Sequence, residues 1–255
     1  MSTPLTDSIN ALTTYANEIT GASDTTLSDA VHTLASGYGV GTLDVFKIGT
    51  NFADLFRDSV LPETVEIDFE GNTNVTSMAT MFFRTSGIKH LIIKNLISTK
   101  TNLPMNAFLY ISPDIIDVTF DNCSFAPSSL ESFGRSCPKL INVFGEIDCT
   151  NSTNNRYWFS SAIENFRIKK NTINIGDTWS NFGTGNNNIT NETLASIGNG
   201  LNPNVSGQTL YVDSKCIPRM NALMGDNDNG DFVLNENGAM SLADFIITVK
   251  GWSLP

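Results

Sequence analysis

Charged residues are scarce in this sequence of 255 residues. They make up 16% of it, and only 15 are Lys or Arg, against 26 Asp and Glu. The basic residues are scattered along the chain without a basic stripe, and the formal net charge of -11 repels phosphates. We therefore expect no nucleic-acid partner and no attraction to a membrane surface.

The sequence also lacks a long apolar run. No stretch approaches the roughly 20 apolar residues that a membrane-spanning helix needs, so we expect no membrane insertion. Residues 1–19 lack the basic start and unbroken apolar segment of a secretory signal peptide. We expect either a signal that has been removed or a protein that joins a particle assembled in the cytoplasm.

Histidine and cysteine are too few, and too unfavourably spaced, for common catalytic and metal sites. Two histidines, His32 and His90, make a His-based triad or a multi-histidine metal site hard to assemble. None of the cysteines forms a CxxC pair, and we expect partly buried thiols without disulfides at Cys123, Cys137, Cys149 and Cys216. We expect no metal site, no cofactor and no catalytic residues.

What the sequence does contain is an internal repeat. Large aromatic residues recur at steps of 26, 26, 25 and 25 residues, namely Phe56, Phe82, Phe108, Phe133 and Trp158. A fixed period in this range is typical of solenoid proteins, in which each repeat is one structural unit.

A second apolar element follows each aromatic residue and has the L-x-x-L-x-L form of a leucine-rich repeat. It occurs as Ile88-x-x-Leu91-x-Ile93, Ile115-x-x-Val118-x-Phe120, Leu140-x-x-Val143-x-Gly145 and Ile163-x-x-Phe166-x-Ile168. An earlier unit contains Leu61, Val65 and Ile67, and a later one Leu194, Ile197 and Leu201 followed by Leu210-x-Val212. The count predicts about six turns of roughly 23–27 residues.

Each turn is expected to contain one strand and one short helix. The alternation of Leu91 and Ile93 indicates a strand with one buried face, and residues 76–82 have helical or 3₁₀ spacing. A single turn cannot bury its own apolar face, so neighbouring turns must stack. The sequence therefore predicts an α/β leucine-rich-repeat solenoid over residues 42–215.

The residue between the two buried positions of each strand should face outward. These residues form a predicted row of Glu66, Ile92, Thr119, Phe144, Arg167 and Tyr211. Exposed apolar and aromatic side chains in such a row favour a binding surface. The alternative is that this face packs against a neighbouring subunit or against N-terminal helices.

Two helices are expected within residues 4–36, in an N-terminal segment that spans residues 1–41. Their apolar seam includes Leu5, Ile9, Leu12, Ile19, Leu27, Val31 and Leu34. The helices could cap the first repeat, or dock onto a partner and self-associate. The Gly-rich linker at residues 37–41 favours docking, because it suits a tether better than a cap.

Residues 216–255 are expected to close the other end of the solenoid. Ser241, followed three residues later by Asp244, predicts the start of an amphipathic helix that ends at Gly251. Residues 225–236 resemble an EF-hand calcium loop, but Gly225 stands where the first ligand is required. We favour a polar surface turn there, with weak calcium binding as the alternative.

An enzyme is a less favoured alternative. Glycoside hydrolysis needs two facing carboxylates, and no pair stands out among Glu66, Asp68, Asp117, Glu146 and Glu164. Charges that flank strands are usually there for solvation, so these residues do not by themselves indicate a catalytic site.

The run from Asn74 to Phe83, leading into Ile88 and Leu91, resembles the BspA-like leucine-rich repeats of bacterial surface proteins. This resemblance covers about residues 50–215 and implies an adhesive or ligand-binding protein without a catalytic site. Residues 5–39 are similar to the starts of tail and fibre proteins of bacteriophages that infect gut-dwelling Gram-positive bacteria.

Together the two resemblances imply a virion protein that is anchored to other virion proteins through its N-terminus. They also imply a homo-oligomer, with a trimer as the analogy from phage fibres, and a host-surface protein or glycan as ligand. The alternatives are a bacterial cell-surface adhesin and, less favoured, a carbohydrate-active enzyme.

Overall fold

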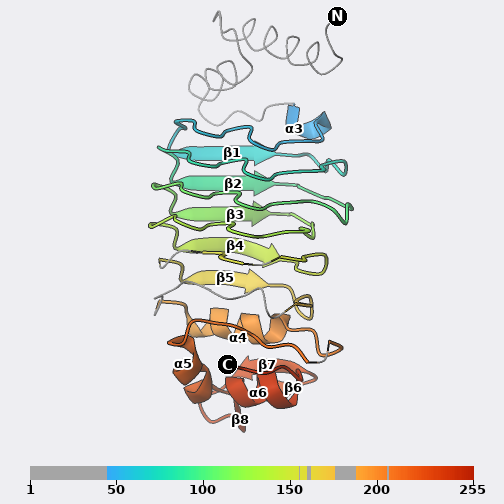
Figure 1. Cartoon of the computed structure of the whole chain (residues 1–255), viewed down its shortest axis with the longest axis vertical. Coiled ribbons are helices and arrows are strands. Elements are labelled where there is room, and N and C mark those ends of the chain that lie inside the picture. The colour runs from blue at the N-terminus through green and yellow to red at the C-terminus, as the bar shows by residue number, and fades with distance from the viewer. Residues whose placement is uncertain (1–44, 155, 160–161, 176–187, 206) are drawn as a thin grey trace, which may run out of the picture.

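The computed structural model describes residues 45–154, 156–159, 162–175, 188–205 and 207–255. Five parallel strands form one sheet and follow one another in chain order (Figure 1). They are β1 (Thr64–Asp68), β2 (His90–Lys94), β3 (Asp117–Asp121), β4 (Asn142–Ile147) and β5 (Asn165–Ile168). The protein is therefore a solenoid, as the repeat predicted, but it is a β-solenoid and not the α/β solenoid that we expected.

The solenoid has fewer turns than the sequence predicted. Five strands delimit four complete repeats, and paired residues such as Thr64 and His90 are one repeat apart. The prediction of about six turns is wrong, because Leu194 and Ile197 lie in helix α4 (Asn191–Gly200) and Leu210 lies outside any strand. A helix and a strand can both bury apolar residues at these spacings, so the pattern alone does not separate them.

A column of aromatic rings fills the solenoid from one coil to the next. Phe82 contacts Phe56 and Phe108 with ring centroids 5.1 and 5.3 Å away, and Phe108 stacks on Phe133 at 5.3 Å. All four rings are at most 3% exposed. The apolar positions of the strand motif are buried beside them, which confirms the predicted core.

The short helices expected before each aromatic residue are replaced by consecutive turns. Left-handed residues recur there, at Asp54 and Asp58 in one coil and at Thr80 and Arg84 in the next. A right-handed helix cannot contain such residues, so the helical prediction is wrong. We call this side, formed by residues 52–59, 78–85, 105–112, 130–136, 154 and 156–159, the turn face.

Backbone hydrogen bonds join the coils of the turn face in one direction. The amides of Phe52, Asp54, Phe56 and Asp58 donate to carbonyls of the following coil, and the same pattern recurs at each later step. The only helix described before β1 is the single turn α3 (Val45–Ile48). The two N-terminal helices predicted within residues 4–36, with their anchoring residues, lie outside the described residues.

A mixed C-terminal unit closes the solenoid after β5 (Figure 1). Helix α4 packs along β5, and its Thr193 and Ser196 hydroxyls accept hydrogen bonds from the amides of Phe166 and Ile168 at 3.3 and 2.9 Å. These bonds satisfy amides that the edge strand would otherwise leave open. The rest of the unit contains α5 (Cys216–Ala222), β6 (Met224–Asp228), β7 (Asp231–Leu234), β8 (Met240–Ser241) and α6 (Leu242–Thr248).

The predicted C-terminal helix is confirmed as α6. The Ser241 hydroxyl accepts a hydrogen bond from the Asp244 amide at 3.0 Å, which is the expected N-cap. Leu242, Phe245 and Ile246 of this helix are fully buried. None of the helices in the part of the chain that the structure describes is long and apolar enough to cross a membrane.

The segment resembling a calcium loop is a β-hairpin. Strands β6 and β7 pair antiparallel, and Asn229 and Gly230 form the connecting turn with φ angles of 52° and 85°. Two left-handed residues in a two-residue loop define a type I′ hairpin turn. The segment is a polar turn, as the sequence favoured. Among the residues whose placement is described, no group of three or more His, Cys, Asp or Glu side chains could hold a metal ion.

Lys250 is buried between the solenoid and α6. The residue is only 1% exposed. Its Nζ donates hydrogen bonds to Asn171 Oδ1 at 2.7 Å and to the Asn199 carbonyl oxygen at 3.2 Å. Burial lowers the pKa of Lys250 from 10.5 to about 8. The folded protein therefore disfavours the lysine charge that the unfolded chain carries freely.

We expect this lysine to make the protein more stable as the pH rises from 8 to 10. In that window the unfolded chain binds a proton at Lys250 that the folded chain has lost, so the free energy of unfolding increases by roughly 2 kcal/mol. Urea unfolding of wild type and Lys250→Met at pH 7.5 and 10 measures this gain. Parallel pH profiles of the two proteins would contradict the expectation.

Candidate binding surfaces

The outward face of the sheet brings together four of the six residues predicted for the binding row. Glu66 pairs with Ile92, Ile92 with Thr119, and Thr119 with Phe144, so these side chains stand in register on consecutive strands. Phe144 is 50% exposed, whereas the other three are half-buried. An aromatic ring thus stands in water at the end of a continuous row.

Arg167 and Tyr211 do not continue this row, although the sequence predicted that they would. A bulge in β4 shifts the register, so that Arg167 lies opposite Glu146 instead of Phe144. The bulge contains Gly145, whose φ is 98° and where a Cβ would lie 2.7 Å from the Phe120 carbonyl oxygen. Tyr211 lies outside the sheet, because α4 follows β5 where a sixth strand was expected.

Charged and polar groups on the sheet face are paired between neighbouring strands. Lys94 Nζ donates to Glu66 Oε1 at 2.7 Å, and His90 Nδ1 lies 2.8 Å from Asp117 Oδ2. The hydrogen bond to Glu66 raises the pKa of Lys94. These pairs leave the exposed ring of Phe144 as the largest apolar feature of the row.

A ladder of amide side chains runs along the ends of the first three strands. Asn95 Nδ2 donates to Asp68 Oδ1 at 2.9 Å, and Asn122 Nδ2 donates to Asn95 Oδ1 at 2.6 Å. The bond from Asn95 holds the pKa of Asp68 below its usual value. Together with the paired Glu66 and Asp117, this leaves three of the five carboxylates considered for glycoside hydrolysis engaged in structural hydrogen bonds.

The four cysteines form no disulfide, as the sequence predicted. Cys137, Cys149 and Cys216 are buried, and Cys123 is half-buried. Burial raises the pKa of Cys123 to about 11 and that of Cys137 to about 12. The thiolate is the reactive form, so none of these groups is prepared for nucleophilic chemistry near neutral pH.

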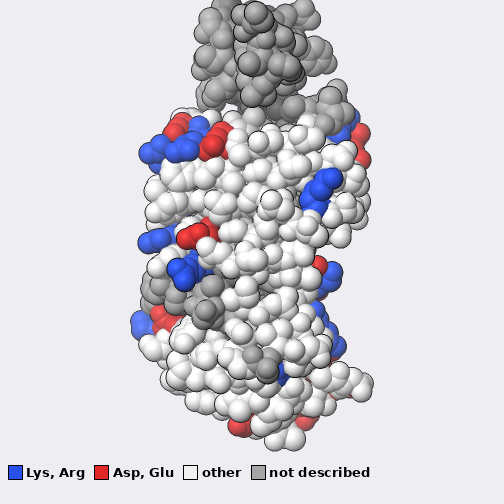
Figure 2. All heavy atoms as spheres, turned by 45° about the vertical axis from the view of Figure 1, so that its right-hand side comes forward, with Lys and Arg blue, Asp and Glu red and all other residues white. Residues whose placement is uncertain are grey.

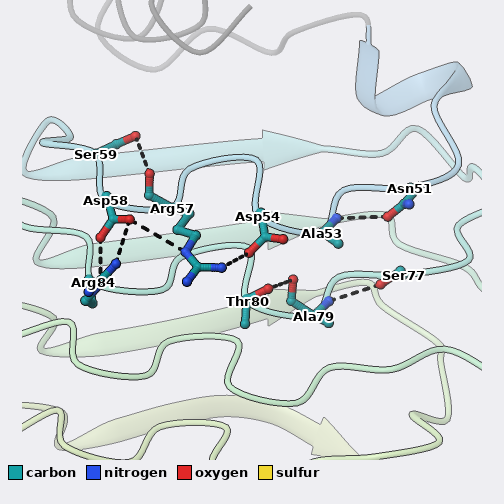
Figure 3. A network of polar contacts seen from close by, with 10 residues as sticks. All are labelled: Asn51, Ala53, Asp54, Arg57, Asp58, Ser59, Ser77, Ala79, Thr80 and Arg84. Carbon is teal, nitrogen blue, oxygen red and sulfur yellow. Dashed lines mark hydrogen bonds and ion pairs between the residues drawn. The ribbon is translucent and has the colours of Figure 1, made fainter. Parts of the chain in front are cut away.

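The turn face carries a second cluster that the sequence did not reveal (Figure 3). The Arg57 guanidinium lies 2.9 Å from Asp54 Oδ1 and 3.6 Å from Asp58 Oδ2. Arg84, one coil further on, lies 2.6 Å from Asp58 Oδ1. The positive charges of two arginines are thus balanced by the negative charges of two aspartates at this end of the turn face.

Aromatic rings and arginines contact one another along the turn face. Arg57 and Arg84 both lie over the ring of Phe83, at 4.7 and 4.9 Å from its centroid. Two coils further on, Arg135 lies over Tyr157 at 4.4 Å and over Tyr110 at 5.8 Å. We call these residues the Arg–aromatic stripe: Arg57, Phe83, Arg84, Tyr110, Arg135 and Tyr157.

The expectation that basic residues are scattered is wrong for arginine. Four of the six arginines of the chain lie on the turn face, namely Arg57, Arg84, Arg135 and Arg156. They are about one coil apart in sequence or further, so they gather only when the coils stack. Figure 2 shows a broad uncharged area between charged margins on the side that it presents.

Comparison with known proteins adds no relative to this geometry. No protein-family model, no curated protein and no solved structure matches the chain. The class of protein is therefore defined by the fold itself, a β-solenoid with a parallel sheet on one face and an Arg–aromatic stripe on the turn face.

Proposed function

We propose that this protein is a non-enzymatic binding protein whose solenoid presents a surface to a host-surface protein or glycan. The observation that carries the proposal is the exposed ring of Phe144, in register with Ile92 and Thr119 on a rigid parallel sheet. Aromatic side chains of this kind supply much of the binding energy at protein interfaces. A stacked solenoid holds such a row in fixed geometry without a ligand.

The finer proposal is a BspA-like leucine-rich-repeat protein that belongs to a virion, as a tail-fibre, head-fibre or baseplate-associated component. The proposal is supported by the sequence of the repeat at Asn74–Phe83 and by the similarity of residues 5–39 to phage fibre proteins. In this proposal the N-terminal segment anchors the protein to other virion proteins and assembles it as a homo-oligomer. The alternative is an adhesin of the bacterial cell surface, for which the same binding face would serve.

We expect Phe144→Ala to lower binding to host cells about ten-fold or more without loss of stability. The ring is half exposed, so its removal takes away little of the core while it deletes the main apolar contact of the row. The measurement is the binding of labelled protein to a panel of Gram-positive bacterial cells. Val233→Ala is the matched control, because Val233 is similarly exposed, at 48%, but lies on β7 in the C-terminal unit.

Equal binding by wild type and both variants would contradict a role for the sheet face. A chain beginning at Thr42 tests the anchoring part separately, since it removes the predicted attachment segment and keeps every coil. It should bind cells as a monomer and fail to join particles. Release of sugars from host polysaccharides by the purified protein would instead favour the carbohydrate-active enzyme.

A further inference from the structure

The two ends of the Arg–aromatic stripe differ in charge balance. Arg57 and Arg84 are neutralised by Asp54 and Asp58. At the other end, none of the ion pairs found among the described residues involves Arg135 or Arg156, and both side chains are exposed. A chain of net charge -11 thus keeps two uncompensated guanidinium groups on neighbouring coils.

The guanidinium of Arg135 is held in place by aromatic rings. It lies over Tyr157 at 4.4 Å and over Tyr110 at 5.8 Å, and both tyrosines are half-buried. A cation–π contact uses the charge of the planar guanidinium and does not consume its N–H donors, so these donors remain available to a ligand. Such a planar donor set fits a carboxylate or a phosphate in a bidentate manner.

The backbone adds positive potential at the same end of the turn face. The amides of Leu130, Ser132 and Gly134 donate to the carbonyls of Asn154, Arg156 and Trp158, in the direction that all coils share. Peptide dipoles aligned in this way sum along the stack, and their positive end points toward the last coil of the turn face that the structure describes. That coil is the one that carries Arg156 and Tyr157.

We infer that the end of the turn face formed by Tyr110, Arg135, Arg156 and Tyr157 binds an anionic glycan. Its carboxylate or phosphate would pair with the two arginines, and its sugar rings would lie against the tyrosines. The inference deepens the proposed function, because it names the chemical class of one host-surface ligand and places it on the turn face, away from Phe144. A nucleic acid fits less well, because its binding depends on several phosphate contacts and two arginines supply few of them.

The test is binding of the full chain to three purified polymers at low salt. Polygalacturonate carries carboxylates, poly(glycerol phosphate) teichoic acid carries phosphates, and dextran is neutral. We expect binding to at least one acidic polymer and none to dextran. Arg135→Gln and Arg156→Gln should each weaken this binding about ten-fold, the loss of one charge-assisted contact.

Arg57→Gln is the matched control, because this arginine lies on the same stripe but is already paired with Asp54. It should change the affinity less than two-fold. An equal loss in this variant would overturn the inference, since the effect would then come from net charge alone. Tighter binding of an oligothymidylate than of either acidic glycan would also overturn it, in favour of a nucleic-acid site.

The outcomes separate this inference from the proposed function. If neither acidic polymer binds while cells are bound through Phe144, the glycan inference fails and the proposed function stands. If an acidic polymer binds through Arg135 while no cell is bound, the inference stands and the proposed function fails.

Discussion

Phe82→Ala should lower the free energy of unfolding by about 4 kcal/mol. The ring is fully buried and lies between Phe56 in the preceding coil and Phe108 in the following one. Its removal leaves a cavity between coils that the strand ladder cannot close, because hydrogen bonds on both faces fix the distance between coils. The loss of stability therefore includes the free energy of transferring the ring from water into the core and most of the free-energy cost of the cavity.

Urea unfolding followed by circular dichroism measures this effect. Phe144→Ala is the control, because it makes the same substitution at an exposed position. Phe144 is half exposed, so its truncation should change the unfolding free energy by less than about 0.5 kcal/mol. If the two variants lost similar amounts of stability, the aromatic column would not be the main link between coils.

Gly87→Ala should destabilise the protein by about 3 kcal/mol or more. Gly87 has a φ of 82°, which an alanine adopts only with strain of about 1 kcal/mol. A Cβ at this position would also overlap the Leu61 carbonyl oxygen of the preceding coil. Because the obstacle is backbone in a hydrogen-bonded coil, the added methyl group has to push neighbouring coils apart.

Gly71→Ala isolates the conformational part of this effect. Gly71 has nearly the same φ, 78°, but no atom lies within 4 Å of the Cβ that alanine would add. Its loss of stability should stay near 1 kcal/mol. Thermal unfolding of the two variants side by side gives the difference, and similar melting temperatures would show that the space around Gly87 is not limiting.

The repeat in the sequence predicted the core and the sheet because both depend on local alternation. In Leu91-x-Ile93 and its counterparts, the apolar residues that alternate are the ones that the solenoid buries. The turn face was not predicted, because its left-handed residues include Thr80 and Arg84, which are not types that mark that conformation. The apolar spacing within residues 76–82 was then mistaken for a helix.

The candidate surfaces were predicted only in part for a related reason. The row from Glu66 to Phe144 follows from strand alternation, but the bulge at Gly145 changes which residue meets Arg167. The Arg–aromatic stripe depends on which residues of different coils come to lie side by side. A search for patterns within one coil therefore could not find it. A comparison of equivalent positions in successive coils could have, because Arg57, Phe83 and Tyr110 recur about one coil apart.

The hydroxyl groups of α4 also determine how far the stack can grow. Thr193 and Ser196 occupy the last open amides of β5, so a strand from another molecule finds no free partner at those positions. Parallel ladders without such a stop are templates for fibrils, because every added chain recreates the edge that it covers. Replacing these two residues would therefore be a route from a discrete protein to an aggregating one.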